Sequence, residues 1–286
     1  MRRTASTFLS IALLLAAPLT TVWAETPKDL LAEVVASRSA EDRARDSSRH
    51  PVATLDFFKV EPGMSVAEAL PGGGWYTTIL AKYLGPKGSL YGVNYVDKMW
   101  GMFSFASEEW AAARIAATAK FPELVAGATD NGINAAGFTF NTVPPKVVGT
   151  VDRVLMIRAL HNLNRFESQA GTRTQALSAV RSMLRDDGLV GVVQHRAPEI
   201  ASDEWADGSR GYLKQSAVIA MFKEAGFHLI ARSEINANPR DQPGADDMVW
   251  RLPPSLRTSK DDPGLRKAMM AIGESDRMTL LFSKAP

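Results

Sequence analysis

The chain has 286 residues, of which 45% are hydrophobic and 22% charged, an ordinary composition for a globular protein. Its 33 basic and 31 acidic residues become equal in number once residues 1–24, which hold two arginines and no acid, are set aside. A nucleic-acid-binding surface needs a marked basic excess, so no nucleic-acid partner is expected. The absence of cysteine excludes thiolate metal sites and cysteine nucleophiles.

The four histidines stand at positions 50, 161, 195 and 228. None of them falls in an H-E-x-x-H or similar ligand spacing, so the sequence predicts no dedicated metal site. No Ser lies in a G-x-S-x-G elbow, and an α/β hydrolase is therefore poorly supported.

Residues 1–24 resemble a secretory signal peptide. Two arginines begin it, residues 8–17 form an apolar run, and Val22-Trp23-Ala24 fits the small-x-small cleavage pattern before Glu25. The alternative is an uncleaved membrane anchor, but the run is far too short to span a bilayer. We therefore expect a periplasmic or secreted mature chain with no stable membrane insertion.

Strand and helix signals alternate along most of the mature chain. The apolar patterns and turn residues predict helices at 28–46, 52–60, 75–84, 108–120, 166–184, 211–225 and 263–272. They predict strands at 65–70, 89–94, 151–157, 189–194, 227–234 and 278–283, with a further edge strand at 137–142.

This alternation predicts a doubly wound α/β fold with a mostly parallel seven-stranded sheet and a helical segment before it. Residues 235–276 interrupt the last pair of strands and are rich in Pro, Asn and Asp. We interpret them as an insertion or lid on a single domain that spans residues 25–286.

The sharpest motif is the stretch from Glu68 to Thr77, Glu-Ala-Leu-Pro-Gly-Gly-Gly-Trp-Tyr-Thr, at a strand-to-helix turn. Glycines there allow a positive φ and a close approach of the backbone to a ligand. The helix beyond them offers free N–H groups at its positive end. The motif is neither a Walker loop nor the dinucleotide fingerprint, since it matches neither spacing.

An acid followed by glycines four and six residues later resembles the first motif of class I S-adenosylmethionine-dependent methyltransferases. The strand at 151–157 with Arg158-Ala-Leu-His-Asn162 resembles the fourth-strand motif of that fold. The chain is also similar to exported bacterial proteins described as predicted methyltransferases. The segments that carry this likeness are Arg49-His50-Pro51, Pro71–Thr77, Arg158–Asn162, Ser233–Pro239 and Ile272–Met278.

The resemblance implies an S-adenosylmethionine site and a cleft for a small-molecule acceptor. The cofactor residues that it implies are Glu68, Pro71, Gly72, Gly73, Gly74, Trp75 and Asn94. The last of these departs from the family pattern, which has an acid at the end of strand two. An amide can still bond a hydroxyl, but it lacks the charge-assisted contact.

Arg158, His161 and Asn162 follow the fourth strand, and ligands of open α/β sheets bind beyond the carboxyl ends of the strands. His161 is a candidate base or substrate-orienting group; its alternative is a buried histidine bonded to a carbonyl. His195 and Arg196 end the next strand, where a structural role is favoured.

Two functions remain open. The first is methyl transfer from S-adenosylmethionine to a small-molecule or envelope substrate. The second is a non-catalytic ligand-binding protein on the same fold, which Asn94 and export from the compartment that makes the cofactor both favour. The sequence decides neither the acceptor nor the oligomeric state.

Overall fold

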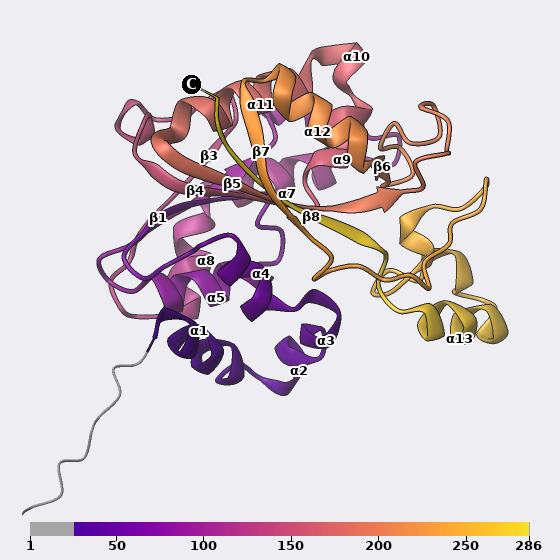
Figure 1. The fold of residues 1–286 in the computed structure, drawn as a ribbon, viewed down its shortest axis with the longest axis horizontal. Helices are drawn as coiled ribbons and strands as arrows, with labels where there is room; N and C mark the ends of the chain where they lie inside the picture. The colour runs from indigo at the N-terminus through magenta and orange to yellow at the C-terminus, as the bar shows by residue number, and fades with distance from the viewer. Residues whose placement is uncertain (1–25, 286) are drawn as a thin grey trace, which may run out of the picture.

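The computed structural model describes residues 26–285 as an α/β protein in which helices cover both faces of one sheet (Figure 1). The signal peptide predicted at residues 1–24 lies outside the described residues. In the part that the structure describes, no helix is long and apolar enough to cross a membrane.

The strands are β1 (Ser65–Ala69), β2 (Ser89–Asn94), β3 (Asn134–Thr139), β4 (Val151–Ile157), β5 (Leu184–Ala197), β6 (Leu213–Lys214), β7 (Phe227–Ser233) and β8 (Arg277–Lys284). Their order across the sheet is β3-β2-β1-β4-β5-β8-β7, with the two-residue β6 paired to the end of β5. The first five strands of this order are parallel, and β8 is antiparallel to both of its neighbours. The predicted mostly parallel sheet is confirmed, and β6 is an addition to its seven strands.

The helices are α1 (Pro27–Ala36), α2 (Ala40–Arg43), α3 (Asp46–Arg49), α4 (Pro51–Phe57), α5 (Trp75–Leu84), α6 (Asp97–Trp100), α7 (Glu108–Ala119), α8 (Phe121–Ala128), α9 (Leu160–Arg165), α10 (Glu167–Ala170), α11 (Thr172–Met183), α12 (Gln215–Glu224) and α13 (Pro263–Ile272). Short 3₁₀ turns lie at η1 (Pro145–Val147), η2 (Val249–Arg251) and η3 (Arg257–Ser259).

Alternate residues of each strand enter one of two apolar cores. Val66 packs with α1, α4, α5 and α8 on one face, whereas Ala67 packs with α6, α9, α11 and α12 on the other. Figure 1 shows these two layers of helices, with α5 and α8 below the sheet and α11 and α12 above it. Because successive side chains of a strand point to opposite faces, Glu68 points with Val66 toward α5.

Two long helices of the sequence prediction are wrong. Residues 28–46 form three short helices, because Ser39 begins α2 by accepting a hydrogen bond from the backbone N–H of Asp42. Residues 166–184, predicted as one helix, instead form two, α10 and α11, and Gly171, with φ of 61°, separates them. In addition, α8 occupies a segment for which the sequence predicted no element.

Candidate functional site

The glycine loop lies between β1 and α5, at the carboxyl edge of the parallel strands. Gly72 and Gly74 both have positive φ, at 58° and 81°, and the N–H of Gly74 donates to the carbonyl of Pro71. A side chain at Gly74 would also press against Leu124 of α8. The loop therefore needs glycine at these positions for its backbone and for its packing.

A cavity of about 150 Å³ opens beside this loop. The loop and the end of β2 contribute Leu70, Pro71, Gly72, Gly92, Asn94 and Tyr95, and the helices contribute Trp100, Arg114, Ala117, Phe121, Leu124 and Asn162. The amide of Asn94 donates to Thr118 Oγ1 at 2.9 Å, which leaves its Oδ1 as an acceptor for a ligand hydroxyl. Three predicted cofactor residues thus line one cavity.

A larger cavity of about 400 Å³ adjoins the first. Its walls are Trp100, Phe103, Ser104, Phe105 and Trp110 from α6, α7 and their connection, His161, Asn162 and Arg165 from α9, and Ser209, Met248, Trp250 and Arg257 from later segments. Three of these residues belong to the predicted insertion at 235–276, whose role as a lid stays a prediction. Five aromatic side chains make this cavity suited to a flat apolar ligand.

Trp100 and Asn162 belong to the walls of both cavities. Trp100 Nε1 and Asn162 Oδ1 are both buried, and neither has a hydrogen-bond partner within residues 26–285. A buried donor and a buried acceptor without partners are costly to the fold. The two residues line the junction of the cavities, where a bound ligand would meet them.

His161 is buried at the wall of the larger cavity, and its Nδ1 lies 3.4 Å from Gln194 Oε1. The amide nitrogen of Gln194 donates to the carbonyl of Gly211, so its oxygen faces the imidazole. Nδ1 therefore carries the proton and Nε2 keeps a lone pair. Burial lowers the pKa of His161 to about 4, so the ring is neutral at pH 7 and a weak proton acceptor.

Glu68 does not line either cavity. It is 5% exposed behind the loop, where Thr77 of α5 donates to its carboxyl at 2.6 Å. Burial raises the pKa of Glu68 to about 7, and the bond from Thr77 offsets only part of this. The predicted direct role of Glu68 in binding has no support in this geometry, and the residue instead joins β1 to α5.

The raised pKa makes protein stability depend on pH. From about pH 4.5 to pH 7 the unfolded chain releases the Glu68 proton before the folded chain does, so stability falls as pH rises. Glu68→Gln keeps the bond to Thr77 and removes this loss. We expect the free energy of unfolding of Glu68→Gln relative to the wild type to rise by about 2 kcal/mol between pH 5 and pH 8.

Denaturant unfolding at the two pH values measures this difference. Glu33→Gln, which alters an exposed glutamate of α1, is the control. An equal difference for Glu68→Gln at both pH values would show that Glu68 is ionised throughout this range.

Gly73 and Trp75, the remaining predicted cofactor residues of the loop, lie outside both cavities. Gly73 is exposed and lines neither cavity, and Trp75 Nε1 donates to the carbonyl of Asp42 at 3.0 Å. The guanidinium groups of Arg38 and Arg49 lie 4.9 and 4.5 Å from the centre of the Trp75 ring. Trp75 thereby fastens α2 and α3 over the first turn of α5.

Arg158 belongs to a cluster of arginines rather than to a cavity wall. Its φ is 59°, and within residues 26–285 its guanidinium has no carboxylate within 4 Å. Burial and Arg277 lower its pKa to about 10. Nearby, Glu274 pairs with Arg45 at 2.7 Å and with Arg277 at 3.1 Å, which joins the N-terminal segment to β8.

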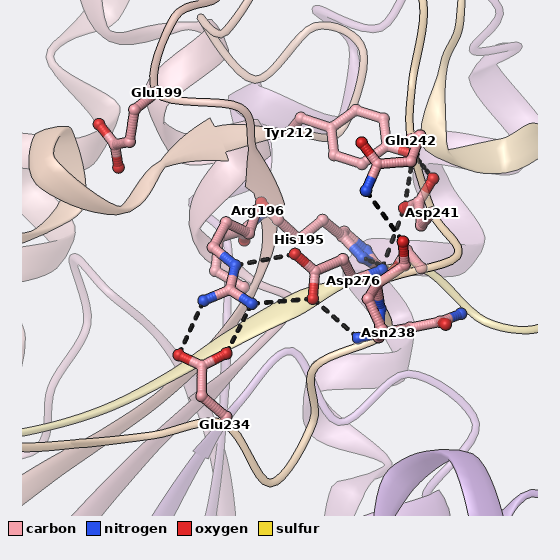
Figure 2. Close-up of polar contacts among 12 residues, drawn as sticks. His195, Arg196, Glu199, Tyr212, Glu234, Asn238, Asp241, Gln242 and Asp276 are labelled. Carbon is pink, nitrogen blue, oxygen red and sulfur yellow. Dashed lines mark hydrogen bonds and ion pairs between the residues drawn. The ribbon is translucent and has the colours of Figure 1, made fainter.

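A second polar network fixes the chain on both sides of the insertion to the end of β5 (Figure 2). Arg196 donates to Glu234 at 2.7 Å and to Asp276 at 2.8 Å, and Asp276 accepts from the backbone of Asn238. His195 bonds Ser275 at 2.6 Å and is absent from both cavity walls. These two residues are therefore structural, as the sequence favoured.

The network continues into the interior through Asp241, which lies beside Tyr212 in Figure 2. Asp241 accepts hydrogen bonds from the Tyr212 hydroxyl at 3.1 Å, from Arg251 at 2.7 Å and from the backbone of Asp276 at 3.0 Å. Arg251 directly follows Trp250 of the larger cavity. The network therefore holds the wall that the insertion contributes.

Sequence reasoning missed most of the aromatic cavity. Residues 99–110 contain four of the five aromatic residues that line it, and this density of aromatic residues could have indicated the cavity from the sequence. Arg165 was also predictable as a residue of the cavity, because it lies one helical turn beyond Asn162 and so on the same face of the helix. No group of three or more potential metal ligands occurs within residues 26–285.

No protein-family profile matches the sequence, and no curated protein matches it. Solved structures do. The [4+2]-cyclase SpnF is 12% identical, with a TM-score of 0.51, over 83% of this chain and 81% of its own. A Burkholderia thailandensis 1,6-didemethyltoxoflavin-N1-methyltransferase, solved with 1,6-didemethyltoxoflavin and S-adenosylhomocysteine, is 12% identical over 96% and 94%, with a TM-score of 0.46.

A SAM-dependent methyltransferase from Aquifex aeolicus is 15% identical over 72% of this chain and 93% of its own, with a TM-score of 0.45. The chain has the class I methyltransferase fold. Its sheet is mostly parallel, as the sequence predicts, with the antiparallel β8 between β5 and β7. At these identities the likeness concerns the fold alone, and activity has to be argued from the site.

Proposed function

We propose that the protein transfers a methyl group from S-adenosylmethionine to a small molecule. The observation that carries this proposal is the pair of adjoining cavities at the carboxyl edge of the sheet, which share Trp100 and Asn162. One cavity borders the glycine loop, and the other has aromatic walls. A group-transfer reaction between two ligands needs two such sites that meet.

The residues of the smaller cavity fit the cofactor. The positive φ of Gly72 brings the backbone close to a ligand, and Asn94 Oδ1 is free to accept from a ribose hydroxyl. At about 150 Å³ this cavity is smaller than the roughly 300–1,000 Å³ of ordinary ligand sites. A bound cofactor would therefore need space beyond this cavity.

When bound, the cofactor supplies an electrophilic methyl group on a sulfonium. The protein aligns the acceptor and excludes water from the aromatic cavity, and this alignment supplies most of the rate enhancement. His161 presents its neutral Nε2 as a hydrogen-bond acceptor, and its low pKa makes orientation its main role. Asn162 and Trp100 offer an acceptor and a donor where the two ligands meet.

The same proposal places the protein among exported bacterial methyltransferases, in the periplasm or outside the cell. It is supported by the sequence of residues 1–24 and by the segments that resemble that family. A non-catalytic ligand-binding role is favoured by one observation: at the cofactor site Asn94 offers a neutral amide oxygen, which lacks the charge-assisted contact that an acid gives to a ribose hydroxyl.

Ligand-induced stabilisation tests the proposal. We expect S-adenosylhomocysteine at about a hundred times its Kd to raise the free energy of unfolding by about 2.7 kcal/mol. Asn94→Ala and Gly72→Val should lose most of this gain, because one removes the hydroxyl acceptor and the other blocks the loop. Asn134→Ala, at an exposed position of β3, should keep it.

Equal stabilisation of wild type, Asn94→Ala and Gly72→Val would place the cofactor elsewhere. No stabilisation of the wild type by either S-adenosylmethionine or S-adenosylhomocysteine would favour the ligand-binding role.

A further inference from the structure

The larger cavity has a chemical character that restricts the acceptor. Phe105 is 56% exposed at its wall, and its ring lies 5.4 Å from Phe103 and 5.2 Å from Trp110. Exposed aromatic rings grouped at the wall of a cavity are typical of a ligand site. Flat rings stack on them with little loss of conformational freedom, so the walls favour an aromatic ligand.

The charge of the cavity is positive. Of its described wall residues, Arg165 and Arg257 are basic and none is acidic. Neither guanidinium has a carboxylate within 4 Å in residues 26–285, as the ion pairs of that region show. Arg165 is held in place by the rings of Phe166 and Phe103, at 5.0 and 5.9 Å. Such a preorganised guanidinium suits a carboxylate and repels a cation.

At the junction with the smaller cavity, the wall favours a ligand group other than a carboxylate. Trp100 Nε1 needs an acceptor, and Asn162 Oδ1 needs a donor. A hydroxyl has the right groups for both atoms, since it donates one hydrogen bond and accepts two. It would accept from Trp100, donate to Asn162 and keep a lone pair toward the smaller cavity.

The helix α9 separates the two groups of the ligand. Asn162 and Arg165 lie three residues apart on it, which is roughly 4.5 Å along the helix axis. A ligand that fills both places therefore carries its hydroxyl and its negative charge at separate positions.

We propose that the methyl acceptor is a hydroxylated aromatic acid, with its hydroxyl at Trp100 and Asn162 and its carboxylate at Arg165 and Arg257. This rests on the proposed methyl transfer. The hydroxyl oxygen would form the bond to the methyl carbon while the carbon–sulfur bond breaks with its electron pair left on sulfur. The hydroxyl proton is released to solvent water.

Calorimetric titration of the purified chain, without cofactor, tests the binding part alone. The probes are para-hydroxycinnamate, the neutral para-hydroxycinnamamide and cinnamate, which lacks the hydroxyl. We expect the hydroxy acid to bind about tenfold more tightly than the amide, the effect of a charge-assisted contact. Cinnamate should bind several-fold more weakly than the hydroxy acid, because it leaves both junction atoms unpaired.

The variants separate the two ends of the ligand. Arg165→Gln and Arg257→Gln should each reduce the preference for the acid over the amide, because each removes a positive charge from the cavity wall. Trp100→Phe should remove the preference for hydroxycinnamate over cinnamate and keep the charge preference. Arg266→Gln, at an exposed position of α13, is the control and should change neither ratio.

Equal affinity for acid and amide, or no binding of the acid at millimolar concentration, would overturn the inference. A separate titration with S-adenosylhomocysteine keeps the two proposals distinguishable. If the acid binds as described and the cofactor does not, the site stands and the proposed methyl transfer fails. If only the cofactor binds, the acceptor class is wrong.

Discussion

Asp241→Ala is expected to lower the free energy of unfolding by about 4 kcal/mol. The side chain of Asp241 is fully buried, and that of Arg251 is 5% exposed. Removing the carboxylate leaves the guanidinium with only Asp247, which is 38% exposed and 3.1 Å away. Tyr212 and the backbone of Asp276 lose an acceptor as well. Breaking a buried ion pair from one side typically costs about 3–5 kcal/mol.

Chemical denaturation measures this loss, and Asp203→Ala provides the control. Asp203 pairs with Lys214 at 2.7 Å, but its side chain is 91% exposed, so its loss should change stability little. The variant at 241 should also weaken binding in the aromatic cavity, because Trp250 precedes Arg251. Similar unfolding free energies for the two variants would contradict the account of the buried network.

Gly137→Ala is expected to lower the free energy of unfolding by about 3 kcal/mol. A methyl group at this position of β3 would overlap the backbone oxygen of Thr118 at the end of α7 and crowd Phe121. Backbone cannot rotate away as a side chain can, so α7 has to shift from the sheet. Overpacking of this kind typically costs about 1–3 kcal/mol, and this contact belongs at the upper end.

Gly127→Ala is the matched control, since nothing lies within 4 Å of the added methyl group inside α8. Alanine there should leave stability unchanged or raise it by roughly 0.5–1 kcal/mol. Gly137→Ala should also weaken cofactor binding, because Thr118 holds Asn94. A wild-type unfolding midpoint for Gly137→Ala would show that β3 and α7 are not packed as described.

The sheet was predictable because its strands are short apolar runs bounded by clear turns. The expected strand at 89–94 and the helix at 75–84 match β2 and α5 to the residue. Gly-Pro-Lys-Gly after Leu84 stops that helix through residues that cannot continue it. The last strand pair was also predicted, at 227–234 and 278–283, but the apolar pattern does not show that β8 runs antiparallel to its neighbours.

The helices whose bounds the sequence did not predict depend on local hydrogen bonds of polar side chains and on tertiary packing. Nothing in the apolar spacing of 28–46 shows that Ser39 will cap a new helix. The helix α8 begins with Phe121-Pro122, and proline is tolerated in the first turn of a helix. The apolar pattern nevertheless predicts no helix in this segment. Its Phe121 packs against Gly92, a contact between distant parts of the chain that no local pattern contains.

The site was predictable in outline and not in detail. Placing Gly72, Asn94 and Asn162 at the strand ends required only the rule for open parallel sheets. The position of Glu68 was predictable in principle, because it lies two residues after the buried Val66 and therefore shares its face of β1, toward α5. Arg158 follows the same strand as Asn162, but its positive φ turns the chain and places it with Arg277.

The central claim is that the glycine loop and the adjoining cavities hold S-adenosylmethionine beside an acceptor. Calorimetric titration of the wild-type protein with S-adenosylmethionine tests it most directly. The account predicts one site per chain, micromolar affinity, and competition by S-adenosylhomocysteine for the same site. Absence of heat at millimolar ligand, together with unchanged thermal unfolding, would contradict the claim and leave a fold without its cofactor.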